Sequence, residues 1–100
     1  MVRMTPIFQR AGMDPWGPFI QAVHESRFRT ELARHFQYWG IRYPQRRTTK
    51  GFPVQYDASD GPGTYLGFKT PEDAAEDYLA CVRTVHPEAW AVRDQPLKYF

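Results

Sequence analysis

The chain has 100 residues, which is enough for one domain and too short for two. Its net charge of +2, with His neutral, is too small to indicate nucleic-acid binding by itself. The single cysteine, Cys81, excludes an intrachain disulfide and a zinc site built from several thiolates, and the three scattered histidines match no ligand spacing, so we expect no metal and no cofactor.

The first predicted element is a helix from Pro15 to Arg27. Asp14 is a good helix cap, and proline is favoured at the first helical position. Behind them, large apolar residues repeat at helical spacing: Trp16, Phe19, Ile20 and Val23. A second helix is predicted to begin at a capping Thr30, to carry Leu32, Ala33 and Phe36, and to stop at Gly40.

The middle of the chain predicts a β-hairpin. Residues Pro44 to Gly51 form a polar loop. Two strand-like runs follow, Phe52 to Tyr56 and Thr64 to Phe68, and the segment between them, Asp57 to Gly63, is dense in turn-forming residues. We therefore expect a hairpin with a long connecting loop.

The clearest helix start is Thr70-Pro71-Glu72-Asp73, in which Thr caps, Pro takes the first position, and the acids favour the positive end of the helix dipole. Pro87 ends this helix and opens a short one to Arg93. The predicted order is helix, helix, hairpin, helix, helix, in a single domain spanning residues 1–100. The expected fold class is α+β, mainly helical.

Glu25 is the first candidate for chemistry. It falls near the end of the first helix, where a carboxylate meets the negative end of the helix dipole. Sequences break such local preferences mainly at functional sites. A carboxyl group placed in this way tends to keep its proton, as a general acid near neutral pH must. The alternative is a solvated Glu that pairs with Arg29 one turn later.

Two blocks of residues resemble a known family. The first block runs from Gln21 to Arg42. Its matching residues are Glu25-Ser26 at the helix end, then Leu32-Ala33, then the aromatic Trp39 followed by Gly40-Ile41 and the basic Arg42. Tyr65 to Tyr78 follows with an aromatic-rich helix start and an Asp-Tyr pair. In this order, flanking a hairpin, the blocks resemble the bacterial endo-β-N-acetylglucosaminidase family of flagellar muramidases, autolysins and phage lysins.

The resemblance implies a minimal lysozyme-like fold, with a helical lobe, a small hairpin lobe and a cleft between them. It implies a glycoside hydrolase that cleaves the β-1,4 backbone of peptidoglycan, with Glu25 as general acid. A glycosidase normally needs a second carboxylate or the N-acetyl group of its substrate. In this family such a residue comes from the hairpin, which makes Asp57 the preferred second catalytic residue and Asp60 the other candidate.

The same resemblance suggests the substrate-binding residues. Ser26 lies beside the acid, Tyr78 matches a cleft-lining tyrosine, and Trp39 and Tyr43 flank the Gly-Ile element, where their rings suit sugar stacking. Packing in the core is the alternative for Trp39 and Tyr78.

Two functional alternatives stay open. Arg29 stands where the family has Gly, and an Arg that pairs with Glu25 would favour the ionised carboxylate and an inactive binding module for glycan or nucleic acid. The Glu-Ser pair also resembles lytic transglycosylases. Basic residues in the polar loop, Arg46, Arg47 and Lys50, are expected to be a solvated surface, so no nucleic-acid partner is expected.

Further expectations concern individual side chains and the location of the protein. We expect Cys81 to be buried and unreactive, Asp77 to be a solvated helix residue, and Tyr56 and Tyr65 to form a cross-strand pair. No apolar run approaches the ~20 residues of a membrane span, and the N-terminus lacks a signal-peptide core. We therefore expect a monomer made in the cytoplasm that acts on the cell wall after release or as part of a phage particle.

Overall fold

The computed structural model describes residues 2–26, 31–43, 49–58 and 61–99. Helices dominate these ranges, and the expected α+β, mainly helical class is confirmed. The elements in chain order are the 3-10 helix η1 (Val2–Met4), α1 (Thr5–Arg10), α2 (Trp16–Ser26), the 3-10 helix η2 (Glu31–His35), β1 (Phe52–Ala58), β2 (Gly61–Gly67), α3 (Pro71–Val85), α4 (Pro87–Ala91) and α5 (Pro96–Tyr99).

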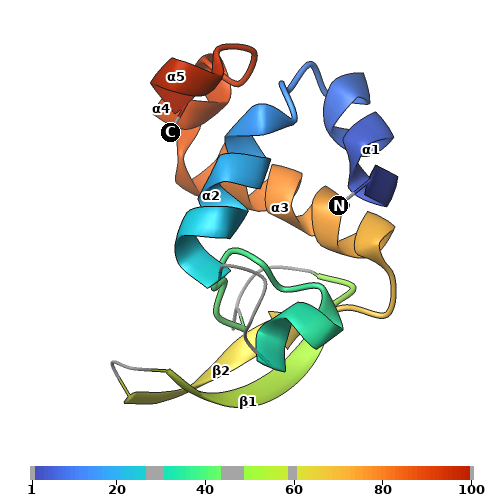
Figure 1. Cartoon of the computed structure of the whole chain (residues 1–100), viewed down its shortest axis with the longest axis vertical. Coiled ribbons are helices and arrows are strands. Elements are labelled where there is room, and N and C mark those ends of the chain that lie inside the picture. The colour runs from blue at the N-terminus through green and yellow to red at the C-terminus, as the bar shows by residue number, and fades with distance from the viewer. Residues whose placement is uncertain (1, 27–30, 44–48, 59–60, 100) are drawn as a thin grey trace.

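Helix α3 runs through the middle of the molecule and organises the other elements (Figure 1). It contacts η1 and α1 on one side and α4 on the other, while α5 contacts α2. The hairpin of β1 and β2 projects below this helical part, with η2 packed on it. The arrangement therefore has a helical lobe and a small β lobe.

One hydrophobic core joins the two lobes. Its largest members include Phe8 of α1, Trp39 of the segment after η2, Leu66 and Phe68 from the region of β2, and Tyr78 of α3. Because these side chains come from elements far apart in the sequence, their burial ties the ends of the chain to its middle.

The start of α3 is formed as predicted. Thr70 has extended backbone angles, and its side-chain oxygen accepts a hydrogen bond of 3.1 Å from the backbone N–H of Asp73. Pro71 follows in the first turn, where its missing N–H has no helical partner to lose. The cap and the proline together explain why this start is recognisable in the sequence.

Helix α2 also begins as predicted, because Asp14 Oδ1 accepts a 2.9 Å hydrogen bond from the N–H of Trp16. Its packing is unusual. The residues that it buries are small or cyclic: Gly17, Pro18 and Ala22. A Cβ on Gly17 would lie 2.8 Å from Cδ2 of Tyr99, so glycine lets α2 approach α5 closely.

The large apolar residues of α2 face outward instead. Trp16, Phe19, Ile20 and Val23 all belong to the exposed hydrophobic residues of the molecule. The apolar repeat therefore indicates the helix correctly, but it is not the face by which α2 joins the core.

The second predicted helix is much shorter than expected. The described part is η2, and it ends at His35 because Phe36 takes a positive φ of 61°, which a helix does not accommodate. The residues that follow have no regular secondary structure as far as Gly40, which also has a positive φ. Thr30, the predicted cap, lies outside the described residues.

The predicted hairpin is present, with longer strands than expected. In the antiparallel register Phe52 pairs with Gly67 and Asp57 pairs with Pro62. Most of the predicted turn segment therefore belongs to the strands, because strand pairing continues as far as Ala58 opposite Gly61. The expected contact of Tyr56 with Tyr65 is confirmed, with ring centroids 5.9 Å apart.

The short helices near both ends of the sequence were not predicted. Helix α1 buries Ile7 and Phe8, and α5 buries Tyr99. Each is too short to show a clear helical repeat, and tertiary burial stabilises it. None of the helices in the described ranges combines the length and apolar character needed to cross a bilayer.

We expect Thr70→Ala to lower the free energy of unfolding by about 1 kcal/mol, since it removes the acceptor for the Asp73 N–H. Thr84→Ala is the matched control. The Thr84 hydroxyl is exposed and bonds back to the carbonyl of Ala80 within α3, so its loss should change stability by less than about 0.5 kcal/mol. Urea unfolding of both variants measures the difference, and equal effects would contradict the capping role.

Candidate active-site cleft

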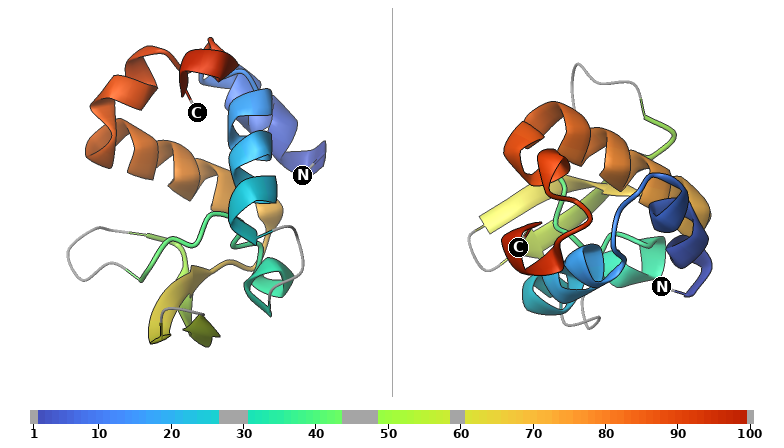
Figure 2. Two further views of the ribbon diagram at one scale, coloured as in Figure 1. Left: turned by 60° about the vertical axis from the view of Figure 1, so that its left-hand side comes forward. Right: turned by 90° about the horizontal axis from the view of Figure 1, so that it is seen from above.

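A cleft of about 550 Å³ opens between α2 on one side and α3, α4 and α5 on the other, with the segment after η2 as its floor. The two views in Figure 2 show how α2 and α3 diverge around this region. The lining residues come from all of these elements: Gln21, His24, Glu25, Trp39, Gly40, Ile41, Tyr78, Cys81, Val82, His86, Ala89 and Tyr99.

Glu25 lies in the last turn of α2 and lines this cleft. Its side chain is exposed to solvent. In the described ranges it is the only carboxylate that lines the cleft, while Gln21 lies one turn earlier on the same side of the helix. The structure therefore brings the predicted acid together with an amide and aromatic surfaces in one concave site.

Trp39 and Tyr78 form the aromatic part of the cleft. Their rings stack with centroids 4.3 Å apart and an angle of 30° between planes. Trp39 is 6% exposed and Tyr78 is 2% exposed, so both are core residues that also line part of the cleft. The core and substrate-binding interpretations of these residues are therefore compatible.

Phe8 supports the stack from behind. Its ring meets Trp39 and Tyr78 in edge-to-face contacts, with centroid distances of 6.3 Å and 5.9 Å. The indole N–H of Trp39 donates a 2.9 Å hydrogen bond to the carbonyl of Pro18, which joins the stack to α2. The position of α2, and of Glu25 on it, depends on this bond and on the small buried residues around it.

Two tyrosine hydroxyls meet at the inner wall of the cleft. The Tyr78 hydroxyl donates to Gln21 Oε1 at 2.6 Å, and the Tyr99 hydroxyl hydrogen-bonds to Tyr78. Burial raises the pKa of Tyr99 to about 12, and burial together with the neighbouring Tyr99 raises the pKa of Tyr78 further. Both hydroxyls stay protonated at neutral pH and act as hydrogen-bonding groups that connect α2, α3 and α5.

A buried amide shapes the Gly40-Ile41 part of the cleft. Gln37 Nε2 donates to the carbonyl of Leu66 at 3.0 Å, and its Oε1 accepts from the N–H groups of Trp39 and Ile41, each at 3.2 Å. One side chain thus fixes the chain on both sides of Gly40 and joins it to β2. Gln37 is not among the predicted site residues, although an amide two positions before the Trp39-Gly40 pair could have indicated its role.

Other predicted site residues lie elsewhere. Tyr43 is exposed, and its N–H bonds the carbonyl of Thr64 at 2.9 Å. Asp57 is exposed in β1. Neither lines the cleft. Ser26 ends α2, beside Glu25 in the chain. The predicted residues outside the described ranges are Arg29, Arg46, Arg47 and Asp60.

Two expectations about α3 are wrong. Asp77 is buried, and it accepts a 2.7 Å hydrogen bond from the Thr49 hydroxyl, because the chain leading to β1 folds over this side of α3. Cys81 is only half-buried and lines the cleft near Tyr78. Its i+3 spacing from Tyr78 was the available signal. In the described ranges, no three His, Cys, Asp or Glu side chains converge as metal ligands.

No protein-family model matches the chain, and comparison with curated proteins and with solved structures finds no significant match either.

The buried hydroxyl pair should make the protein sensitive to high pH. A tyrosine whose pKa rises from 10.0 unfolded to about 12 folded binds its proton more tightly in the native state. Between these pH values the unfolded chain holds fewer protons, so the free energy of unfolding falls as pH rises. Below pH 10 this contribution is fully present.

We expect Tyr99→Phe to show a shallower loss of stability from pH 10 to about 12 than the wild type, because one shifted group is removed. Urea unfolding across this range measures the slope, and absorbance of tyrosinate during titration gives an independent readout. Identical slopes in the two proteins would contradict the assignment.

Proposed function

We propose that the protein is a glycoside hydrolase that cleaves the β-1,4 backbone of peptidoglycan, with Glu25 as general acid. The observation that carries the proposal is the meeting of Glu25, the Gly40-Ile41 element and Tyr78 in one cleft. These residues come from both sequence blocks that resemble the endo-β-N-acetylglucosaminidase family. Their meeting in one concave site supports the proposal.

The chemistry of the lining suits a sugar substrate. Ile41 and Ala89, both partly exposed, offer apolar surface against which a pyranose ring can pack, while Gln21 and His86 offer polar groups for its hydroxyls. In this proposal Glu25 donates its proton to the glycosidic oxygen as the bond to the leaving sugar breaks. Because Glu25 lies on a helix that the Trp39–Pro18 hydrogen bond holds, its carboxyl has a defined position relative to the ring surface.

The second catalytic group is proposed to come from the substrate. Among the residues that the structure describes, Glu25 is the only carboxylate that lines the cleft. Some retaining glycosidases use the N-acetyl group of their own substrate as the nucleophile in place of a second carboxylate. Both sugars of peptidoglycan carry such a group, so a single acid is sufficient.

We expect Glu25→Gln to lower the rate of lysis of isolated peptidoglycan by about 10²–10⁴-fold, because the amide cannot donate the proton. Turbidity loss of purified cell-wall sacculi measures lysis. Glu76→Gln is the matched control, since Glu76 is an exposed residue of α3 that pairs only loosely with Lys50, at 3.8 Å. Full lysis by Glu25→Gln would disprove the role of Glu25, and a wild type that binds nucleic acid or glycan without lysis would favour a binding module.

We expect Asp57→Asn to keep lysis within about threefold of the wild type, because the reaction then depends on one protein carboxyl. The assay is the same, and circular dichroism of both proteins verifies folding. A loss comparable to that of Glu25→Gln would restore Asp57 as the second catalytic residue and would indicate that the hairpin closes toward the cleft.

The single lining carboxylate also favours one alternative, a lytic transglycosylase. That enzyme attacks the anomeric carbon with a hydroxyl of the same sugar and leaves anhydro-sugar ends, whereas a hydrolase leaves reducing ends. Mass spectrometry of the released fragments distinguishes the two, and both outcomes depend on Glu25.

A further inference from the structure

The side chain of Gln21 is held at the inner wall of the cleft by the two tyrosine hydroxyls. The Tyr78 hydroxyl donates its only hydrogen to Gln21 Oε1, at 2.6 Å. The hydrogen bond between Tyr78 and Tyr99 must then use the hydrogen of Tyr99. The three groups therefore form a chain with one direction, in which Tyr99 donates to Tyr78 and Tyr78 donates to the amide oxygen.

This chain determines which edge of the Gln21 amide a ligand meets. Because Oε1 is turned toward Tyr78, the planar amide turns Nε2 away from that hydroxyl. Among the residues that the structure describes, Tyr78 is the hydrogen-bond partner of this side chain, so both Nε2 hydrogens remain for a ligand. Gln21 is partly exposed and lines the cleft. The cleft wall therefore offers hydrogen-bond donors at this point.

The place of Gln21 beside Glu25 matches the layout of an N-acetylated sugar. Gln21 lies one helical turn before Glu25, and side chains four residues apart on a helix are neighbours. In such a sugar the acetamido group is on the carbon next to the one whose glycosidic bond breaks. A ring that places its glycosidic oxygen at Glu25 therefore brings its N-acetyl group toward a neighbouring side chain of the cleft, and Gln21 is that neighbour on α2.

We propose that the group bound by Gln21 is the carbonyl oxygen of the N-acetyl group rather than a hydroxyl, which makes the cleft selective for N-acetylated sugars over free amino sugars. This oxygen only accepts hydrogen bonds, as an amide that presents its donors requires. A free amino group is protonated near neutral pH and only donates, so it would meet donors without an acceptor. The inference rests on the proposed function, which supplies the pose of the sugar.

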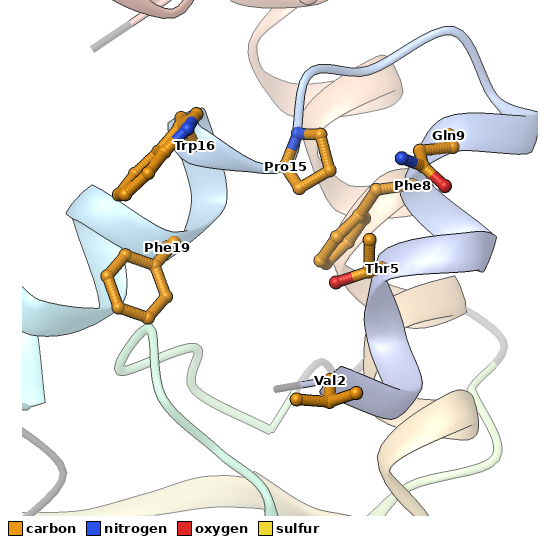
Figure 3. A pocket seen from close by; sticks show the side chains of 7 residues that line it. All are labelled: Val2, Thr5, Phe8, Gln9, Pro15, Trp16 and Phe19. Atoms are coloured by element: carbon orange, nitrogen blue, oxygen red, sulfur yellow. The ribbon is translucent and has the colours of Figure 1, made fainter.

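A second hollow of the molecule lacks this arrangement. It occupies about 400 Å³ between α1 and α2, and its polar side chains are Thr5 and Gln9. Figure 3 shows both on α1, across from the rings of Trp16 and Phe19 on α2. In the described ranges no acidic side chain lines this hollow, so a sugar bound there would have no carboxyl group beside its glycosidic oxygen. The selectivity is therefore assigned to the cleft.

Binding is measured in a Glu25→Gln background, which prevents cleavage of the probe. The probes are a β-1,4-linked tetramer of N-acetylglucosamine and the same tetramer without its acetyl groups, at about pH 6, where an amine is charged. NMR titration gives the dissociation constant of each. We expect the N-acetylated tetramer to bind more than about tenfold more tightly, because its carbonyl oxygen pairs with the Gln21 amide.

Gln21→Glu in this background separates ligand binding from a structural role. The carboxylate keeps an oxygen for the Tyr78 hydroxyl and replaces the N–H donors with an acceptor. The midpoint of urea unfolding should therefore stay close to that of the parent protein, while affinity for the N-acetylated tetramer falls more than about tenfold. The charged tetramer should bind more tightly than it does to the parent, because its ammonium groups meet a carboxylate. A side chain that only joined α2 to α3 would not reverse the preference.

Gln55→Glu is the matched control. Gln55 is exposed on β1 and does not line the cleft, and its Oε1 accepts a 3.3 Å hydrogen bond from the Thr64 hydroxyl. The substitution thus makes the same change of charge on an amide that also accepts from a hydroxyl. Both dissociation constants should stay within about threefold of the parent values, since solvent and salt screen a charge outside the cleft.

The proposal is overturned if the two tetramers bind equally, if neither binds at about 10 mM, or if Gln21→Glu and Gln55→Glu change the affinities equally. Lysis of peptidoglycan by the wild type is measured separately. Selective binding without lysis would contradict the proposed hydrolase and support N-acetyl recognition by a binding module. Lysis with unselective binding would contradict only the role of Gln21.

Discussion

The stack of Trp39 on Tyr78 is the contact on which the rest of the structure depends. Tyr78 places it on α3, Phe8 brings α1 against it, and the indole N–H of Trp39 holds α2 through the carbonyl of Pro18. The same two rings form part of the cleft. In a chain of this length the core and the site share residues, because too few side chains exist to build them separately.

This sharing has a consequence for mutagenesis. A truncation of Tyr78 removes a core aromatic, which costs about 3–5 kcal/mol in well-packed proteins, and would unfold a marginally stable domain before its role at the site became visible. Removing a hydroxyl or exchanging a carboxyl for an amide keeps the packing. Substitutions of that kind separate function from folding here.

The elements that could be predicted from sequence are those with local signals. Thr70 and Asp14 cap their helices as expected, and the hairpin follows from two β-rich runs around a turn. The elements that the sequence did not predict depend on contacts between residues far apart in the chain. Helix α1 is stabilised by the contact of the Phe8 ring with Trp39. The 3-10 helix η2 ends because Phe36 adopts a positive φ, after which Gln37 hydrogen-bonds to the backbone of β2. No pattern within a few residues encodes those contacts.

The residues of the candidate site also fall into those that the sequence predicts and those that it does not. Glu25, Trp39 and Tyr78 could be chosen from sequence, and the fold brings them together. Cys81 lines the same cleft, as its position one helical turn after Tyr78 could have indicated. His86 also lines it, but its place there follows from how α3 and α4 pack, which residue spacing does not specify. Asp77 looked solvated because the partner that buries it, Thr49, is distant in the chain.

Helix α2 is attached to the protein by small residues and a few hydrogen bonds. Gly17, Pro18 and Ala22 bury little apolar area, so the helix gains less from packing than α3, whose buried face includes Tyr78 and Val82. Segments with little buried apolar area open locally at a lower free-energy cost than the global unfolding of the domain. The amide hydrogens of α2 should therefore exchange with solvent faster than those of α3. Since Glu25 belongs to this segment, a ligand that binds in the cleft and stabilises α2 would also hold the Glu25 carboxyl in place, so ligand binding and local order would be linked.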